Sequence, residues 1–297
     1  MAIDHLMQED RAVEFLAREL RRGTLVLVLG AGTSLGAGLP DWRSLVNRLR
    51  DKAGMPPVST TAADELQSAA DEVLREFCKG NQEVFAHLVK DCLYDGVKLS
   101  WNLVKDDLLI ALGALISGSR RGSVKRILTL NFDSILEWYL TLHGFVPRVI
   151  LQPPAIEGAE DVRIYHPHGF LSHPDLNFPE SDFVILGLKS INRRLGTQGD
   201  PWWEMTRHFF RTGLCLFVGL SPASFKDRAL APLLETVGAE LQHDRPTGFW
   251  FLHGDRNDAQ AREFLDGNVV PFYYGRHEQA PGFLLSICKQ AADGIAM

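Results

Sequence analysis

Apolar runs of four to six residues alternate with amphipathic segments along most of this chain. A run such as residues 24–29 (TLVLVL) is typical of a parallel strand that is buried on both faces. Segments with apolar residues three and four positions apart are typical of helices that cover such a sheet. Because the two kinds alternate, the chain is expected to form βαβ units. We therefore predict an α/β fold, a Rossmann-like and mostly parallel sheet with helices on both faces.

The predicted elements begin with a helix over residues 7–22, the strand at residues 24–29 and a helix over residues 41–53. Further strands are expected at residues 126–130, 145–150, 163–168, 183–188, 214–218, 248–252 and 269–273. Further helices are expected at residues 134–142, 201–211, 226–241, 258–265 and 279–292.

Residues 55–118 differ from the rest because they show helical spacing and contain no strand-like run. A basic, glycine- and serine-rich stretch, residues 117–126, follows them and is expected to be a flexible loop. We therefore predict two units. Residues 1–54 and 119–297 form the sheet domain, and residues 55–118 form a helical insert or cap.

The composition excludes several classes of protein. The chain has 31 Lys and Arg residues against 37 Asp and Glu, a net charge of −6, so we expect no direct nucleic-acid binding. The longest apolar stretch, residues 108–116, is too short to span a bilayer, and the N-terminus has no signal-peptide pattern. We expect a cytoplasmic protein without membrane contact. Its four cysteines form no CxxC pair, so no metal site is expected.

The strongest local signal is a glycine-rich stretch, residues 30–43 (GAGTSLGAGLPDWR), directly after the first strand. Glycine permits a sharp turn and lets a pyrophosphate approach the backbone amides closely. Thr33 and Ser34 can donate hydroxyl groups to the same phosphates. The spacing departs from GxGxxG because Gly36 comes one residue late, which disfavours a hydride-transferring dehydrogenase. A tight turn without a ligand is the structural alternative.

Two further polar signals stand at predicted strand ends, where open α/β sheets bind ligands. Asn131, in TLNFD, offers a donor and acceptors that suit ribose hydroxyls or a water. Asp133 in the same segment can contact a ligand, cap the next helix, or do both. His168, in YHPHGF, is expected to be exposed at the sheet edge, and its reference pKa of about 6.5 suits acid–base work near neutrality.

Two other patterns leave alternatives open. His166, His168 and His173 could form a metal cluster, although their spacing matches no zinc pattern, and each could instead make a structural hydrogen bond. Gly219 and Ser221, in the segment VGLS, end another buried strand. They could contact a nucleotide or form a plain turn.

Together these segments resemble the sirtuin family. The stretch at residues 30–43 is similar to the sirtuin loop GAGxS…GIPDFR, and TLNFD is similar to TQNxD, with Leu130 in place of glutamine. The histidine–glycine pair of HPHG and the later VGLS segment occur in the family's order. Sirtuin deacylases usually carry a four-cysteine zinc module, which this chain lacks. In both departures it resembles the sirtuin-like domains of prokaryotic anti-phage defence systems, which degrade NAD.

The resemblance implies a sirtuin-type NAD-binding domain with NAD as the substrate and Asn131 and His168 as the catalytic pair. Trp42 stands where the family often has an aromatic residue over the nicotinamide ribose. The residues implied to line the dinucleotide site are Gly30, Ala31, Gly32, Thr33, Ser34, Asp41, Trp42, Arg43, Asp133, Gly219 and Ser221.

The leading functional hypothesis is an NAD glycohydrolase that releases nicotinamide and ADP-ribose, as an effector of bacterial anti-phage defence. Asn131 would orient the ribose or a water, and His168 would accept a proton. The alternatives are an NAD-dependent protein deacylase or ADP-ribosyltransferase, and a nucleotide-responsive binding subunit without catalysis.

The resemblance also implies that activity is controlled by assembly. We expect a homo-oligomer, with a separate ATPase of the HerA class as a candidate partner. Residues 7–22 and 55–118 are the candidate contact surfaces. The alternative is that these helices simply cover the core.

Overall fold

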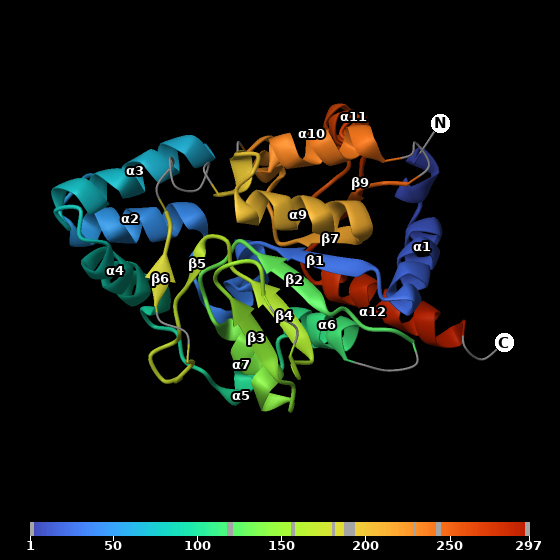
Figure 1. The fold of residues 1–297 in the computed structure, drawn as a ribbon, viewed down its shortest axis with the longest axis horizontal. Coiled ribbons are helices and arrows are strands. Elements are labelled where there is room, and N and C mark those ends of the chain that lie inside the picture. Colours follow the sequence, from blue (N-terminus) through green and yellow to red (C-terminus); the bar gives the residue numbers. More distant parts are fainter. Residues whose placement is uncertain are drawn as a thin grey trace.

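The computed structural model describes residues 3–117, 121–155, 158–179, 182–186, 194–227, 230–241 and 245–294. Its centre is a seven-stranded parallel sheet in the order β3-β4-β2-β1-β7-β8-β9 (Figure 1). The strands are β1 (Leu25–Leu29), β2 (Arg126–Thr129), β3 (Pro147–Ile150), β4 (Val162–Tyr165), β7 (Leu214–Val218), β8 (Gly248–His253) and β9 (Val269–Tyr274). The predicted α/β, Rossmann-like fold is confirmed.

Two predicted strands end differently in the structure. The strand expected at residues 163–168 stops at Tyr165, so His166 and His168 lie beyond the sheet. Of residues 183–188, only Phe183–Val184 form a strand, β6, which pairs antiparallel with β5 (Gly169–Phe170) in a separate small sheet. Residues 187–188 lie outside the described part of the chain.

The described helices include α1 (Glu9–Arg22), α2 (Trp42–Lys52), α3 (Ala63–Glu76), α4 (Gln82–Tyr94), α5 (Trp101–Val104), α6 (Asp107–Ile116), α7 (Ile135–Leu142), α9 (Pro201–Thr212), α10 (Ala231–Glu240), α11 (Asp258–Asp266) and α12 (Gln279–Asp293). The helix predicted over residues 226–241 begins later, at Ala231, because Pro232 lacks a backbone N–H and fits only a first helical turn. No helix in this part of the chain is long and apolar enough to cross a membrane.

The strands alternate between two apolar cores, one on each face of the sheet. In β1, Leu25, Leu27 and Leu29 face the core that contains α1, α6, α7 and α12. Val26 and Val28 face the core that contains α9, α10 and α11. Figure 1 shows α9, α10 and α11 on one side of the sheet, α6, α7 and α12 on the other, and α1 at the end of the sheet. All five β1 residues are buried, which explains the continuous apolar run.

Residues 55–118, predicted as a helical insert, contain helices α3 to α6, but these helices do not pack together as one unit. The helices α3 and α4 pack with α2 at one end of the molecule, whereas α6 packs on α12 and α7 beneath the sheet (Figure 1). Gly113 in α6 allows this close packing, because a Cβ there would lie 2.9 Å from Cε1 of Tyr139. Of the basic loop at residues 117–126, residues 118–120 lie outside the described part, and β2 already begins at Arg126.

Candidate functional site

The first part of the site is the loop between β1 and α2, which packs against the end of β7. Two short 3-10 helices, η2 (Ala31–Thr33) and η3 (Leu35–Ala37), form most of this loop. Backbone hydrogen bonds join Gly30 N to Val218 O at 3.0 Å and Gly32 N to Gly219 O at 2.9 Å. A Cβ on Gly32 would lie 2.8 Å from the Gly219 Cα. These glycines are therefore needed for contact between two segments of the protein itself.

Asn131 connects this loop to the end of β2. Its side-chain Nδ2 lies 3.1 Å from Gly30 O, 3.2 Å from Thr33 Oγ1 and 3.3 Å from Ser34 Oγ. Its backbone N–H donates to Thr129 Oγ1 at 3.1 Å. The predicted meeting of the glycine-rich loop with Asn131 thus exists in the structure, because β1 and β2 are adjacent parallel strands whose carboxyl ends coincide.

Asp133 is both a cap and a member of the site. One carboxylate oxygen accepts a hydrogen bond from Ser34 Oγ at 2.9 Å, and the other accepts from the Ile135 N–H at 3.1 Å, at the start of α7. Burial and the neighbouring carboxylate of Glu137 raise the pKa of Asp133 to about 6, against the two hydrogen bonds. Asp133 is therefore largely ionised at neutral pH.

His168 is buried rather than exposed, which corrects the prediction from the sequence. It precedes β5, where the chain has turned back over the end of β2, and only 8% of it is accessible to solvent. Burial lowers the pKa of His168 to about 4, so the ring is neutral at physiological pH. The neighbouring Leu130 backbone acts in the opposite direction and raises the pKa, and Nε2 has no hydrogen-bond partner among the described residues.

The other two histidines have separate structural partners. His166 Nε2 lies 2.8 Å from Glu137 Oε1, and His166 Nδ1 lies 3.1 Å from Asn131 O. His173 packs edge-on against Tyr94, with ring centroids 4.9 Å apart. Within the described ranges no group of three or more His, Cys, Asp or Glu side chains is placed to hold a metal ion.

Glu137 is a site residue that our sequence reasoning missed. It belongs to the first turn of α7 and is almost completely buried, at 1% exposure. The available signal was a lone carboxylate within the apolar stretch of residues 134–142. A buried carboxylate requires a hydrogen-bond partner, and the partner of Glu137 is His166, which directly follows β4.

The remaining predicted residues lie at the edges of this arrangement. Asp41 caps α2 by accepting a hydrogen bond from Ser44 N at 2.7 Å. Burial raises the pKa of Asp41, but the hydrogen bonds with Ser44 outweigh burial, so the pKa is lowered. Trp42 packs on Phe132, with ring centroids 6.4 Å apart, and Phe132 in turn lies 6.3 Å from His168. Arg43 and Ser221 are exposed, and Ser221 Oγ contacts Ser224 Oγ at 3.2 Å.

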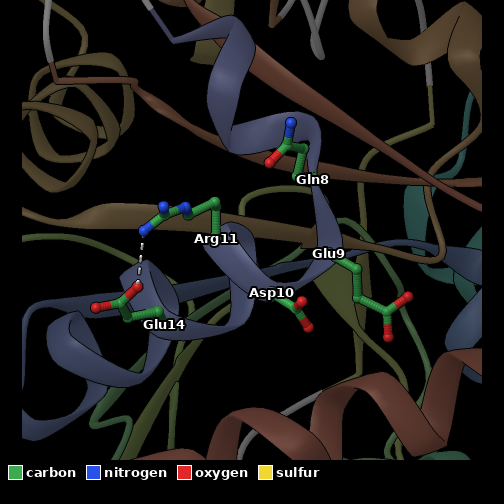
Figure 2. Close-up of a pocket in the computed structure, with 5 residues that line it drawn as sticks. All are labelled: Gln8, Glu9, Asp10, Arg11 and Glu14. Carbon is green, nitrogen blue, oxygen red and sulfur yellow. Dashed lines mark ion pairs between the residues drawn. The ribbon is translucent and has the colours of Figure 1, made fainter.

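A small cavity of about 10 Å³ lies between the loop, the end of β2 and the helices α6 and α7, which is room for about one water molecule. Its lining consists of Leu29, Thr33, Ser34, Leu109, Leu112, Thr129, Asn131, Asp133, Leu136 and Glu137. A more open hollow lies beside α1 (Figure 2), at the other end of the molecule from α2 (Figure 1). In Figure 2 its exposed side chains diverge, apart from the Arg11–Glu14 ion pair at 3.6 Å.

Comparison with known families identifies the region that contains these strand ends. Residues 125–272 match the family model of the SIR2-like domain. This chain carries a SIR2-like domain. SIR2-like domains bind NAD, so the match indicates an NAD-related activity. A comparison with curated proteins found no match. The matched region contains Asn131, Asp133, His168 and Gly219, and the glycine-rich loop outside it is joined to it through Asn131.

Proposed function

We propose that this protein is an NAD glycohydrolase that cleaves NAD to nicotinamide and ADP-ribose. The observation that carries the proposal is the convergence of three segments. The glycine-rich loop after β1, Asn131 after β2 and His168 after β4 meet at the carboxyl end of the sheet. Ligands of open α/β sheets bind at this end, and the SIR2-like domain supports NAD as that ligand.

Asn131 would orient the nicotinamide ribose or the attacking water. Its Nδ2 group has two hydrogens but lies near three acceptor oxygens, so its hydrogen bonds can be redistributed. A ribose hydroxyl or a water can replace Thr33 or Ser34 as an acceptor without leaving a buried donor unpaired. The amide would then fix the position of the reacting ribose.

His168 would act through Nε2. Among the described residues Nε2 has no hydrogen-bond partner, and in the neutral tautomer with its hydrogen on Nδ1 it carries a lone pair. This nitrogen can accept a hydrogen bond from a ribose hydroxyl or a water. With a pKa of about 4, His168 is a weak base. Its role is therefore to orient the ribose hydroxyl or the water. It would accept a proton from that group late in the reaction, when the group becomes acidic.

Asp133 would stabilise the developing charge. Cleavage of the bond between nicotinamide and ribose builds positive charge on the sugar, as in other glycoside-type reactions. The ionised Asp133 carboxylate is held by Ser34 and by the start of α7 next to Asn131. A fixed negative charge in a buried site interacts strongly with such a cation.

The small cavity beside Asn131 would have to widen to admit a nicotinamide ribose. Small-molecule sites have volumes of roughly 300–1,000 Å³, whereas the cavity beside Asn131 measures about 10 Å³. Gly30 and Gly32 are fixed to the end of β7 by backbone hydrogen bonds, whereas the contacts of Thr33 and Ser34 with Asn131 and Asp133 are side-chain hydrogen bonds that a ligand can replace. NAD would separate Thr33 and Ser34 from Asn131 as it enters.

Product analysis tests this function. The wild-type protein, in its assembled form, is incubated with NAD alone and with NAD plus an acetylated peptide. We expect nicotinamide and ADP-ribose in equal amounts in both mixtures. O-acyl-ADP-ribose in the second mixture would instead support a deacylase. Tight binding of ADP-ribose without any product would support a binding subunit.

The resemblance to defence proteins suggests the biological role. An enzyme that hydrolyses NAD without control would deplete the host cell, so the activity requires a trigger. We propose that this protein is a defence effector whose activity depends on assembly into a homo-oligomer, with an ATPase of the HerA class as a candidate partner.

A further inference from the structure

The most deeply buried pair of ionisable side chains beside the site is Glu137 and His166, at 1% and 0% exposure. The sequence offered His166 only as a member of a metal cluster or as a structural hydrogen-bonding residue, and it gave Glu137 no role. Burying a carboxylate and an imidazole is costly unless both are well hydrogen-bonded. The pair comes from different elements, since Glu137 lies in α7 and His166 directly follows β4.

The hydrogen bonds of His166 fix its ring at both nitrogens. Nδ1 lies 3.1 Å from the carbonyl oxygen of Asn131, which can only accept, so Nδ1 carries a hydrogen and donates it. Nε2 lies 2.8 Å from Glu137 Oε1, and one proton lies between these two atoms whichever of them carries it. The ring also packs edge-on against Phe170, with centroids 5.1 Å apart.

Side-chain hydrogen bonds hold the main chain at Asn131, beyond the last pair of the β2–β4 ladder. The β2–β4 ladder ends with the pair Leu128 and Tyr165, so on the β4 side no strand in the described part of the chain pairs with the main chain at Asn131. Two side chains bind the main chain of Asn131 instead. Thr129 Oγ1 accepts a hydrogen bond from the Asn131 N–H, and His166 Nδ1 donates one to the Asn131 carbonyl oxygen. With both sides of its main chain held, Asn131 points its amide at the glycine-rich loop.

We propose that His166, held by Glu137, is a positioning residue that sets the main chain of Asn131 and thereby aims the Asn131 amide into the site. The expected effect on kcat rests on the proposed NAD cleavage, whereas the expected effect on the position of the Asn131 amide does not. Within the described residues, Oε2 of Glu137 has no hydrogen-bond partner and Glu137 also lines the small cavity. The hydrogen bond from Oε1 of Glu137 to His166 is therefore the contact by which Glu137 acts on Asn131.

Two near-isosteric substitutions separate the two contacts of His166. In His166→Asn the side-chain N–H₂ group takes the place of Nδ1, so the donor to Asn131 is kept and the contact to Glu137 is lost. In His166→Gln the N–H₂ group takes the place of Nε2, so the contact to Glu137 is kept and the donor to Asn131 is lost. Crystal structures of both variants and the kcat and KM of NAD cleavage are measured. His173→Gln, a buried histidine that does not touch Asn131, is the control.

We expect Asn131 Nδ2 to leave Gly30 O in His166→Gln and to stay in place in His166→Asn and His173→Gln. A displaced catalytic group costs about tenfold to a hundredfold in rate, so kcat of His166→Gln should fall by that factor with KM changed less than threefold. His166→Asn keeps the donor to Asn131 but loses the contact to Glu137, so its kcat should fall less than that of His166→Gln. An unmoved Asn131 in His166→Gln overturns the inference, whether or not the wild type cleaves NAD. Cleavage by His166→Gln at the wild-type rate also overturns it. Absence of cleavage by the wild type overturns the proposed function alone, because the position of Asn131 still decides this inference.

Discussion

At the scale of single residues, the glycines of the site are explained by close approach of the backbone. Gly219 has a φ of +73°, which side chains rarely adopt, and a Cβ there would lie 2.6 Å from the Thr33 N. The sequence pointed to a glycine-rich loop for phosphate binding. It could not show that the crowding partner of Gly30 and Gly32 is the end of β7, because that contact joins segments almost two hundred residues apart.

Substitution of Gly219 tests this packing. Gly219→Ala should reduce the free energy of unfolding by roughly 2–4 kcal/mol, because it combines an unfavourable φ with a backbone clash. Gly38→Ala is the matched control, since Gly38 has a φ of +84° but open space around its Cβ. It should cost only about 1–2 kcal/mol. Urea unfolding measures both values, and equal losses would show that the β7 contact is unimportant.

His168 predicts a dependence of stability on pH. Its pKa is about 4 in the folded protein because of burial, against about 6.5 in an unfolded chain. Between these values the unfolded state binds more protons, so His168 makes the protein less stable as pH falls from about 6.5 to about 4. The difference in pKa corresponds to about 3 kcal/mol.

The measurement compares wild type with His168→Gln, which lacks the titrating ring. Over this pH range the wild type should lose about 3 kcal/mol of unfolding free energy relative to the variant. Parallel pH profiles for the two proteins would contradict the buried, neutral state of His168.

At the scale of elements, the sequence predicted every strand of the parallel sheet, and β1 and β7 stand out because strands buried on both faces are continuous apolar runs. It was less accurate where long-range contacts decide the structure. The segment after β4 turns away from the sheet at His166, whose side chain is bound by Glu137 and Asn131. The convergence of Asn131 with the glycine-rich loop followed from the adjacency of parallel strand ends. The roles of Glu137 and His166 required knowledge of the fold.

Substitutions in α6 test whether residues 55–118 unfold together with the sheet. Leu115 is completely buried in the core shared by α6 and α12, whereas Ile110 in the same helix is 39% exposed. Leu115→Ala should cost about 2–5 kcal/mol and lower the midpoint of a single unfolding transition. Ile110→Ala should cost less than about 1 kcal/mol. A separate early transition in Leu115→Ala would show instead that these helices unfold as an independent cap.

At the scale of the whole molecule, the proposed control by assembly can be tested. The chain has a mass of 33.2 kDa, and multi-angle light scattering at micromolar concentration should give a multiple of this value. The 55–118 segment carries Trp101, which is 75% exposed, and Trp101→Ser should shift the distribution towards the single chain if this segment forms the contact. A lone monomer at all concentrations would count against assembly.

The central claim is that Asn131 and His168 act together at one NAD-cleaving site. The most direct test is the initial rate of nicotinamide release from NAD by assembled wild type, Asn131→Ala, His168→Ala and the control His173→Gln. We predict release by the wild type and the control, and a loss of about a hundredfold or more in each of the other two variants. Nicotinamide release at the wild-type rate by Asn131→Ala or His168→Ala, or none from the assembled wild type, would contradict the claim.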